Sequence, residues 1–316
     1  MTEALPLLDL TPWYEGPAES LDRLLSDIDR CLTESGFLLI TGHRVPPELR
    51  SRTREVARRF FHLPDSEKEQ VAAANYRGWV RNGDEATGLA SGEDHLPDVK
   101  ESFNIGREPY GPYADQPRNL WPADPEFRSV MTEYATELLR LGDDLLRLFA
   151  RTLGLQEHYL TALAAHPPSQ LTLNWYPSIE RIGTPEPDRF RIGPHTDYGC
   201  VTILDREPGV AGLQICTLDG RWIDAPSYPD AYTINIGDLL ERLTGNRWRS
   251  TRHRVLPPDP AAASEELLSM AFFHELSTDA RVDTLAPPYG GGTGYPPVIA
   301  GEYVEQKLNS VIVATR

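Results

Sequence analysis

The hydrophobic positions in the first half of the chain recur at the spacing of a helix. Between Leu21 and Leu32 the leucine and isoleucine side chains return every three or four residues, and Gly36 stops the run before the apolar residues 37–40. This pattern predicts a helix followed by a short strand. Similar patterns predict further helices, which begin at Pro46, extend over residues 126–152, and close the chain over residues 299–311.

The spacing changes near residue 168, where short apolar or alternating stretches are separated by Gly, Pro and Asp. Evenly spaced short strands with such turn residues are typical of an antiparallel sandwich or jelly roll. The preceding residues 73–120 show no sustained period apart from a short strand at 100–105, so we expect loops at the mouth of a pocket. The sequence therefore predicts a mostly β core with flanking helices. Strands are expected at residues 170–175, 189–192, 201–204, 213–217, 232–236, 249–255 and 267–274.

Composition and charge narrow the class of protein. The 316 residues can bury a large core, and we expect one integrated domain with an N-terminal helical support region (1–165), the β core (166–285) and a C-terminal loop and helix (286–316). The net charge of −16 argues against nucleic acid or an anionic membrane as a partner. Three scattered cysteines, with no leader or long apolar run, favour a cytoplasmic protein with a small-molecule substrate. The oligomeric state is left open.

Two histidines and one aspartate carry the candidate chemistry. His195 and Asp197 are separated by one residue, and His253 follows later in the β region. Two imidazoles and a carboxylate are the ligand set of a mononuclear non-haem Fe(II) site, which leaves positions open for O2 and for a substrate or co-substrate. Because side chains alternate along a strand, His195 and Asp197 are expected to share a face. One alternative is that His195 is an ordinary polar turn residue and His253 a satisfied barrel histidine. Another is a pseudoenzyme whose site holds no metal or holds zinc.

The surroundings of these residues matter, because a His-x-Asp pair is expected about once by chance in a chain with eight histidines and 47 acidic residues. The informative segments are residues 191–197, 202–204, 212–215, 219–222, 233–238 and 246–253, with 34–43, 59–64 and 100–103 nearer the N-terminus. In order and spacing they resemble the isopenicillin N synthase-like branch of the Fe(II)/2-oxoglutarate oxygenases. The resemblance implies a double-stranded β-helix (a cupin-like jelly roll), Fe(II) held by His195, Asp197 and His253, and O2 as co-substrate.

A second group of residues resembles the co-substrate site of that family. Asn174 and Tyr176 match its Asn-x-Tyr-Pro segment and Ser269 matches the serine of its Arg-x-Ser segment, which implies that they help to bind 2-oxoglutarate. The arginine of that segment, which pairs with the distal carboxylate of 2-oxoglutarate, is replaced here by Leu267. A carboxylate buried there without a cation would be strongly destabilised. For Tyr176 the alternative is a buried tyrosine at a strand end.

Leu267 leaves two explanations open. In the first, another arginine supplies the charge: Arg191 shares the parity of His195, whereas Arg206 and Arg252 have a less favourable parity. In the second, the enzyme uses no 2-oxoglutarate and, like isopenicillin N synthase, draws all four electrons for O2 reduction from its substrate.

The favoured hypothesis is an Fe(II)- and O2-dependent oxidoreductase: a 2-oxoglutarate-dependent dioxygenase that hydroxylates, desaturates or cyclises a small specialised metabolite. The alternatives are a 2-oxoglutarate-independent oxidase and a non-catalytic ligand-binding protein, although a binding protein has no need of three metal ligands. A nucleic-acid demethylase is disfavoured by the acidic charge. Arg77, Trp79, Phe103 and Phe273 are candidates for the mouth of the pocket, and the aromatic ones are equally candidates for the core.

Overall fold

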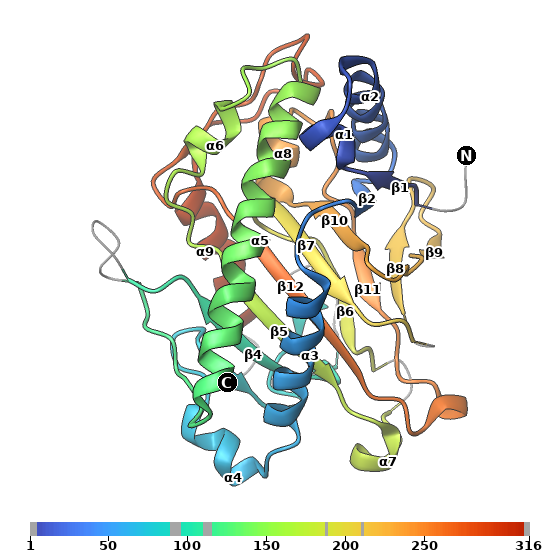
Figure 1. The fold of residues 1–316 in the computed structure, drawn as a ribbon, viewed down its shortest axis with the longest axis vertical. Helices are drawn as coiled ribbons and strands as arrows, with labels where there is room; N and C mark the ends of the chain where they lie inside the picture. The colour runs from blue at the N-terminus through green and yellow to red at the C-terminus, as the bar shows by residue number, and fades with distance from the viewer. Residues whose placement is uncertain (1–4, 89–95, 110–115, 187–188, 210–211, 313–316) are drawn as a thin grey trace.

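A large sheet forms the centre of the molecule, and its strands come from most of the length of the chain (Figure 1). The computed structural model describes residues 5–88, 96–109, 116–186, 189–209 and 212–312. The eight strands are ordered β1-β2-β10-β7-β12-β5-β4-β3, and every pair except β1 with β2 is antiparallel. Their bounds are Leu7–Asp9 (β1), Phe37–Thr41 (β2), Tyr232–Ile236 (β10), Val201–Arg206 (β7), Leu267–His274 (β12), Gln170–Tyr176 (β5), Glu101–Gly106 (β4) and Gly78–Val80 (β3).

A smaller antiparallel sheet has the order β6-β11-β8-β9. Its strands, with those of a separate two-stranded sheet, are Ile192–His195 (β6), His253–Val255 (β11), Leu213–Cys216 (β8), Trp222–Asp224 (β9), Arg281–Val282 (β13) and Val298–Ile299 (β14). Together with the helices described below, the two larger sheets confirm the predicted mostly β core with flanking helices.

Strands β6 and β11 begin later than the sequence predicts, at 192 rather than 189 and at 253 rather than 249. The backbone before each strand is bonded to other segments. The Phe190 carbonyl accepts from the Val99 N–H, and the Arg249 N–H donates to the Leu32 carbonyl. Because these backbone groups are satisfied outside the sheet, both strands are short and start close to the two histidines.

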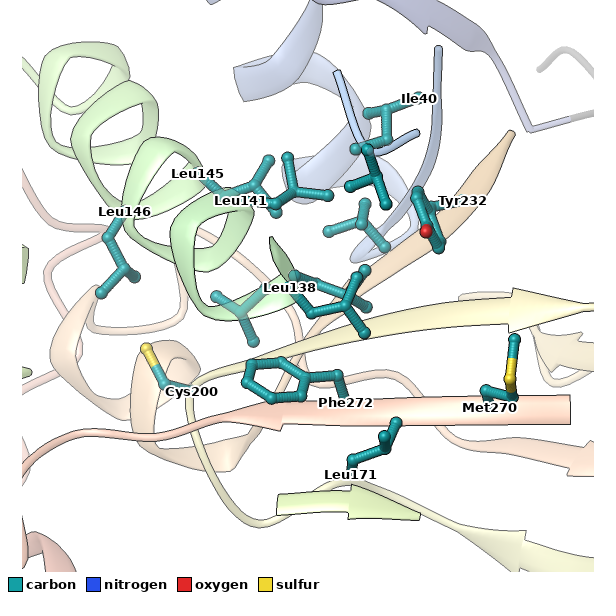
Figure 2. Close-up of a cluster of buried hydrophobic side chains, with 14 of the residues drawn as sticks. Ile40, Leu138, Leu141, Leu145, Leu146, Leu171, Cys200, Tyr232, Met270 and Phe272 are labelled. Atoms are coloured by element: carbon teal, nitrogen blue, oxygen red, sulfur yellow. The ribbon is translucent and has the colours of Figure 1, made fainter. Parts of the chain in front are cut away.

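Helices cover one face of the large sheet, and the longest, α5 (Pro125–Thr152), runs across it (Figure 1). The Asp124 carboxylate caps the start of α5 by accepting from the Glu126 N–H at 2.9 Å. Figure 2 shows Phe272 of β12 beside Leu138 of α5, with Met270 pointing to the same side of the strand. Side chains alternate along a strand, so Ser269 and its odd-numbered neighbours face away from α5. The other helices are Thr11–Glu15 (α1), Ala18–Glu34 (α2), Pro47–Phe61 (α3), Asp65–Lys68 (α4), Tyr159–Leu163 (α6), Ile179–Ile182 (α7), Asp238–Leu243 (α8) and Ala300–Ile312 (α9), with 3-10 turns at Glu69–Val71 and Pro260–Ala262.

The helices predicted from apolar spacing are confirmed as α2, α3, α5 and α9. The division into 1–165, 166–285 and 286–316 stays a prediction, and strands from both sides of residue 165 share the large sheet. Within the part of the chain that the structure describes, no helix combines the length and the hydropathy needed to cross a membrane.

A buried carboxylate joins the helices to the large sheet. Asp205 of β7 is fully buried, and Arg50 of α3 donates to its two oxygens at 2.9 and 3.1 Å. Arg54 of α3 pairs with the same carboxylate, and the Tyr134 hydroxyl of α5 donates to it at 2.8 Å. One charge therefore links three elements through charge-assisted hydrogen bonds.

Candidate metal centre

The two predicted histidine ligands lie side by side on neighbouring strands of the small sheet. His195 ends β6, His253 begins β11, and the two residues are cross-strand partners with ring centroids 4.2 Å apart. Asp197 lies just after β6, and its Oδ1 is 3.7 Å from the Nε2 atom of each histidine. The structure thus brings together the three side chains singled out in the sequence. Among the described residues, they form the one group of three His, Cys, Asp or Glu side chains whose ligand atoms lie close enough to share a metal ion.

Backbone carbonyls determine which imidazole nitrogen faces the centre of the site. Nδ1 of His195 lies 2.8 Å from the Gly193 carbonyl oxygen, and Nδ1 of His253 lies 3.0 Å from that of Thr251. A carbonyl oxygen only accepts, so these contacts assign the proton to each Nδ1 and leave a lone pair on each Nε2. This tautomer is the one that can bind a metal through Nε2.

The electrostatics of the site favour the metal-binding protonation states. Burial and the neighbouring His253 lower the pKa of His195 to about 4. Burial by itself would raise the pKa of the Asp197 carboxyl, but the two imidazoles and the hydrogen bonds from Thr202 and Asn235 outweigh it and lower that pKa. Near neutral pH the site therefore offers a neutral His195 and an ionised Asp197, as metal ligation requires.

Two residues without a predicted role hold the second oxygen of Asp197. Asn235 of β10 donates to Asp197 Oδ2 from Nδ2 at 2.6 Å, and the Thr202 hydroxyl of β7 donates to the same atom. These two residues are cross-strand partners, so the pairing of β7 with β10 places both side chains next to Asp197 Oδ2. Both lie in segments that resemble the oxygenase family, but their convergence depends on strand pairing that the sequence does not reveal.

We expect Asn235→Ala to weaken Fe(II) binding by about 10- to 100-fold, the usual effect of removing a hydrogen bond to a metal ligand. The carboxylate would lose one of the donors that orient it. An anaerobic titration against a competing chelator measures the dissociation constant. Asn309→Ala, an exposed change on α9, serves as the matched control. Equal Fe(II) affinity in the two variants would contradict an orienting role for Asn235.

The three residues predicted to bind the co-substrate share one face of the large sheet. Asn174 of β5 and Ser269 of β12 are cross-strand partners, and Tyr176 lies two residues along β5 on the same side. All three are buried, and the Tyr176 hydroxyl lies 3.4 Å from the Ser269 hydroxyl. The cross-strand partner of Tyr176 is Leu267, which stands where the family has its arginine. This end of the site therefore carries an apolar side chain in place of a cation.

The structure corrects the parity assigned to Arg206. Arg206 is the cross-strand partner of Ser269 and therefore lies on the same face as the predicted co-substrate residues. The parity argument was wrong because alternation does not carry through the loop between β6 and β7. The Arg206 guanidinium is engaged by the Ala225 and Pro226 carbonyls and lies 3.3 Å from the Thr233 hydroxyl. Arg252 lies near the Trp222 ring, with Cζ 6.0 Å from its centroid.

The remaining candidate, Arg191, lies beside the predicted co-substrate residues. Its side chain is buried, and Cζ is 5.4 Å from the centroid of the Tyr176 ring. The hydroxyl and amide groups on this face of the large sheet thus have a buried guanidinium close to them. This set of donors fits a dicarboxylate such as 2-oxoglutarate.

A cavity of about 370 Å³ adjoins His195 and Asp197. Arg77 and Phe273, two candidates for its mouth, line it, whereas Trp79 and Phe103 are buried in the hydrophobic core. Cys200 also packs in that core, and all three cysteines are free.

Glu275 is a further lining residue of this cavity and had no predicted role. Its Oε2 atom is shielded from water and has no hydrogen-bond partner among the described residues. Burial, followed by the nearby charge of Asp197, raises the pKa of Glu275 to about 7. A Cβ at Gly199 would overlap the Glu275 carboxyl, so the glycine makes room for it.

Comparison with protein families gives two matches that together cover most of the chain. Residues 5–124 match the family described as "non-haem dioxygenase in morphine synthesis N-terminal", and residues 168–276 match the 2OG-Fe(II) oxygenase superfamily. The chain is 36% identical to validamycin A dioxygenase of Streptomyces hygroscopicus subsp. limoneus, over 97% of this chain and 86% of that one. It is 31% identical to a homoarginine-6-hydroxylase of Arabidopsis thaliana, over 91% of this chain and 89% of that one.

Solved structures share the fold. A Neurospora crassa protein in complex with alpha-KG and thymine superposes with a TM-score of 0.84 at 26% identity, over 97% of this chain and 96% of that one. JOX2 in complex with 2OG, Fe and JA gives a TM-score of 0.77 at 26% identity, over 98% and 85% of the two chains. These similarities support the predicted jelly roll and the 2-oxoglutarate hypothesis over the oxidase and binding-protein alternatives.

Proposed function

Because this chain belongs to the 2-oxoglutarate- and Fe(II)-dependent oxygenases, we propose that His195, Asp197 and His253 are its iron ligands and that it oxidises a small polar metabolite. The convergence of the two Nε2 atoms and one carboxylate oxygen carries the proposal. Bound iron, 2-oxoglutarate and O2 supply the oxidising chemistry in this family. The protein residues bind, orient and shield the reactants.

In this proposal, the residues of the site form three groups, each with a different role. The triad binds iron, and Asn235 and Thr202 orient its carboxylate. Asn174, Tyr176 and Ser269 bind 2-oxoglutarate on the face turned away from α5. The side chains that line the cavity beside the triad select the substrate and exclude water from it.

The expected test is an anaerobic titration of the Fe(II)-loaded protein with 2-oxoglutarate, followed in the visible absorption that a 2-oxo acid produces on binding Fe(II). A saturable band is expected, and succinate should form when O2 and a substrate from a panel of polar metabolites are added. Stoichiometric Fe(II) binding with no band would overturn the proposed co-substrate site. A band with no succinate across a broad panel would instead favour a binding protein.

The cavity favours a substrate that donates hydrogen bonds. Glu275 Oε2, which has no hydrogen-bond partner among the described residues, would accept a hydrogen bond from a substrate amine or hydroxyl, and a buried acceptor left without one is costly. The buried Arg77 guanidinium, which lies 2.6 Å from the Gln170 amide oxygen, adds donors to the same cavity. We therefore place amino- or hydroxyl-substituted metabolites ahead of hydrocarbons and simple carboxylic acids in the panel.

For the best substrate in the panel, Glu275→Gln should raise KM by about 3- to 10-fold, because the amide oxygen still accepts but forms a neutral hydrogen bond in place of a charge-assisted one. Steady-state succinate formation gives KM, and the spectroscopic titration shows whether 2-oxoglutarate binding is preserved. Glu48→Gln, an exposed change at the start of α3, is the matched control. An unchanged KM in the Glu275 variant would remove this residue from the substrate site.

We also propose a reducing, cytoplasmic setting and no role for nucleic acid or membranes. The three free cysteines and the net charge of −16 support this proposal. Cell fractionation with an antibody to the protein tests the location.

A further inference from the structure

Because position 267 is a leucine, it supplies no cation to the carboxylate that would bind in the proposed co-substrate site. Leu267 and Tyr176 are cross-strand partners, and Ser269 lies two residues further along the same face. A dicarboxylate bound against Tyr176 and Ser269 would bring a negative charge to buried surroundings. A buried carboxylate needs a cation within hydrogen-bonding reach.

Arg191 brings a guanidinium to the surroundings of Leu267. Its Nη atoms lie 3.4 Å from the Glu265 carboxylate, and Glu265 is two residues before Leu267. Its Cζ lies 5.4 Å from the ring centroid of Tyr176, the partner of Leu267. A Cβ at Gly209 would contact the side chains of both Glu265 and Leu267, so both side chains lie beside this glycine. The guanidinium therefore lies beside the neighbours of Leu267, although Arg191 belongs to the segment just before β6.

The distance between the Arg191 backbone and the triad also matches the combined length of an arginine side chain and a 2-oxo dicarboxylate bound at the triad. Arg191 lies four residues before His195, so about 13 Å of strand separates them. With bonds of about 1.5 Å, a five-carbon dicarboxylate and an arginine side chain are each ~6 Å long. Together they cover the span from the triad to the Arg191 backbone.

Two other cations near this face have different partners from Arg191. Lys100 pairs with Glu85 and donates to the Ser102 hydroxyl at 2.8 Å. Arg206 is engaged by the Ala225 and Pro226 carbonyls. Burial lowers the pKa of Arg191, against the opposing effects of Glu265 and Tyr176, and a second carboxylate would offset that burial further.

We infer that Arg191 has taken over the function of the arginine missing at position 267, and that it binds the distal carboxylate of 2-oxoglutarate from the β6 side together with Tyr176 and Ser269. The inference rests on the proposed co-substrate site. The residue proposed to bind the distal carboxylate, Arg191, is 74 positions away from Glu265 in sequence but adjacent to it in space.

The test compares two 2-oxo acids in the anaerobic titration of the Fe(II)-loaded protein. 2-Oxopentanoate has the five-carbon chain of 2-oxoglutarate with a methyl group in place of the distal carboxylate. Arg191→Gln should weaken 2-oxoglutarate binding by about 100-fold or more, as expected for a buried charge that loses its partner. It should leave 2-oxopentanoate and Fe(II) binding nearly unchanged. The preference of the wild type for 2-oxoglutarate over 2-oxopentanoate should then disappear.

A relocation experiment provides the second variant. Arg191→Leu combined with Leu267→Arg returns the guanidinium to the family position and should restore 2-oxoglutarate binding to within about 10-fold of the wild type. Glu265→Gln separates anchoring from a structural ion pair: it removes the ion pair between residues 191 and 265 but should not weaken 2-oxoglutarate binding. Arg128→Gln, an exposed change on α5, is the surface control.

The outcomes distinguish the inference from the proposed function. If the wild type gives no band with 2-oxoglutarate, the proposed co-substrate site itself fails. If the wild type binds 2-oxoglutarate and Arg191→Gln binds it equally well, the site stands and the anchor assignment is wrong. Parallel losses for both 2-oxo acids in Arg191→Gln would also overturn the assignment, because the effect would not depend on the distal carboxylate.

Discussion

Replacement of Asp197 by alanine is expected to abolish Fe(II) binding at micromolar concentrations and, with it, all succinate formation. Asp197 supplies the only anionic side chain of the described triad, and its Oδ1 faces both histidines at 3.7 Å. Loss of an outer-shell donor costs about 10- to 100-fold in metal affinity, and loss of a direct charged ligand should cost more. Anaerobic calorimetry with Fe(II) measures the binding, and a coupled succinate assay measures the turnover.

The control for this prediction is Asp22→Ala, which removes an exposed carboxylate from α2. It should bind one Fe(II) per chain with the affinity of the wild type. Far-UV circular dichroism should show that the Asp197 variant keeps its fold, because the carboxylate lies in a loop after β6. Stoichiometric Fe(II) binding by Asp197→Ala would show that the metal is held elsewhere.

The order of elements was predictable because apolar spacing reports which face of a helix or strand is buried. The long helix α5 and strands β5, β7, β10 and β12 follow directly from that spacing. The spacing does not report which strands pair. The backbone groups before β6 and β11 bond outside the sheet, so both strands begin later than the alternation suggests. Very short strands such as β1 and β9 contain too few residues for a period to be recognised.

The limits of prediction at the site have the same cause. His195, Asp197 and His253, which the structure brings together, were predicted from residue type and local order, which the sequence contains. Asn235 and Thr202 converge on Asp197 only because β10 pairs with β7. The parity of Arg206 was wrong because the loop after β6 resets the alternation between the two sheets. In each case the missing information is a contact between segments that are far apart in sequence.

The second large effect is expected on stability. Asp205→Asn should lower the free energy of unfolding by about 3–5 kcal/mol, the cost of breaking a buried ion pair by removing one partner. The Arg50 side chain, only 6% exposed, would keep its charge while its bidentate carboxylate is lost. Urea unfolding followed by fluorescence and by circular dichroism measures the change. A loss below about 1 kcal/mol would show that Arg50 is stabilised by its other neighbours.

Asp205 and the proposed co-substrate site lie on opposite faces of the large sheet, which makes the stability effect separable from function. Asp205 is the cross-strand partner of Met270 and faces the helices, whereas Arg206 is the partner of Ser269 and faces the site. Below its unfolding transition, Asp205→Asn should therefore bind 2-oxoglutarate nearly as tightly as the wild type. Asp283→Asn, which removes an exposed partner of Arg281, should leave both the stability and the binding unchanged. A large loss of 2-oxoglutarate affinity in folded Asp205→Asn would mean that the helix-facing charges also set the geometry of the site.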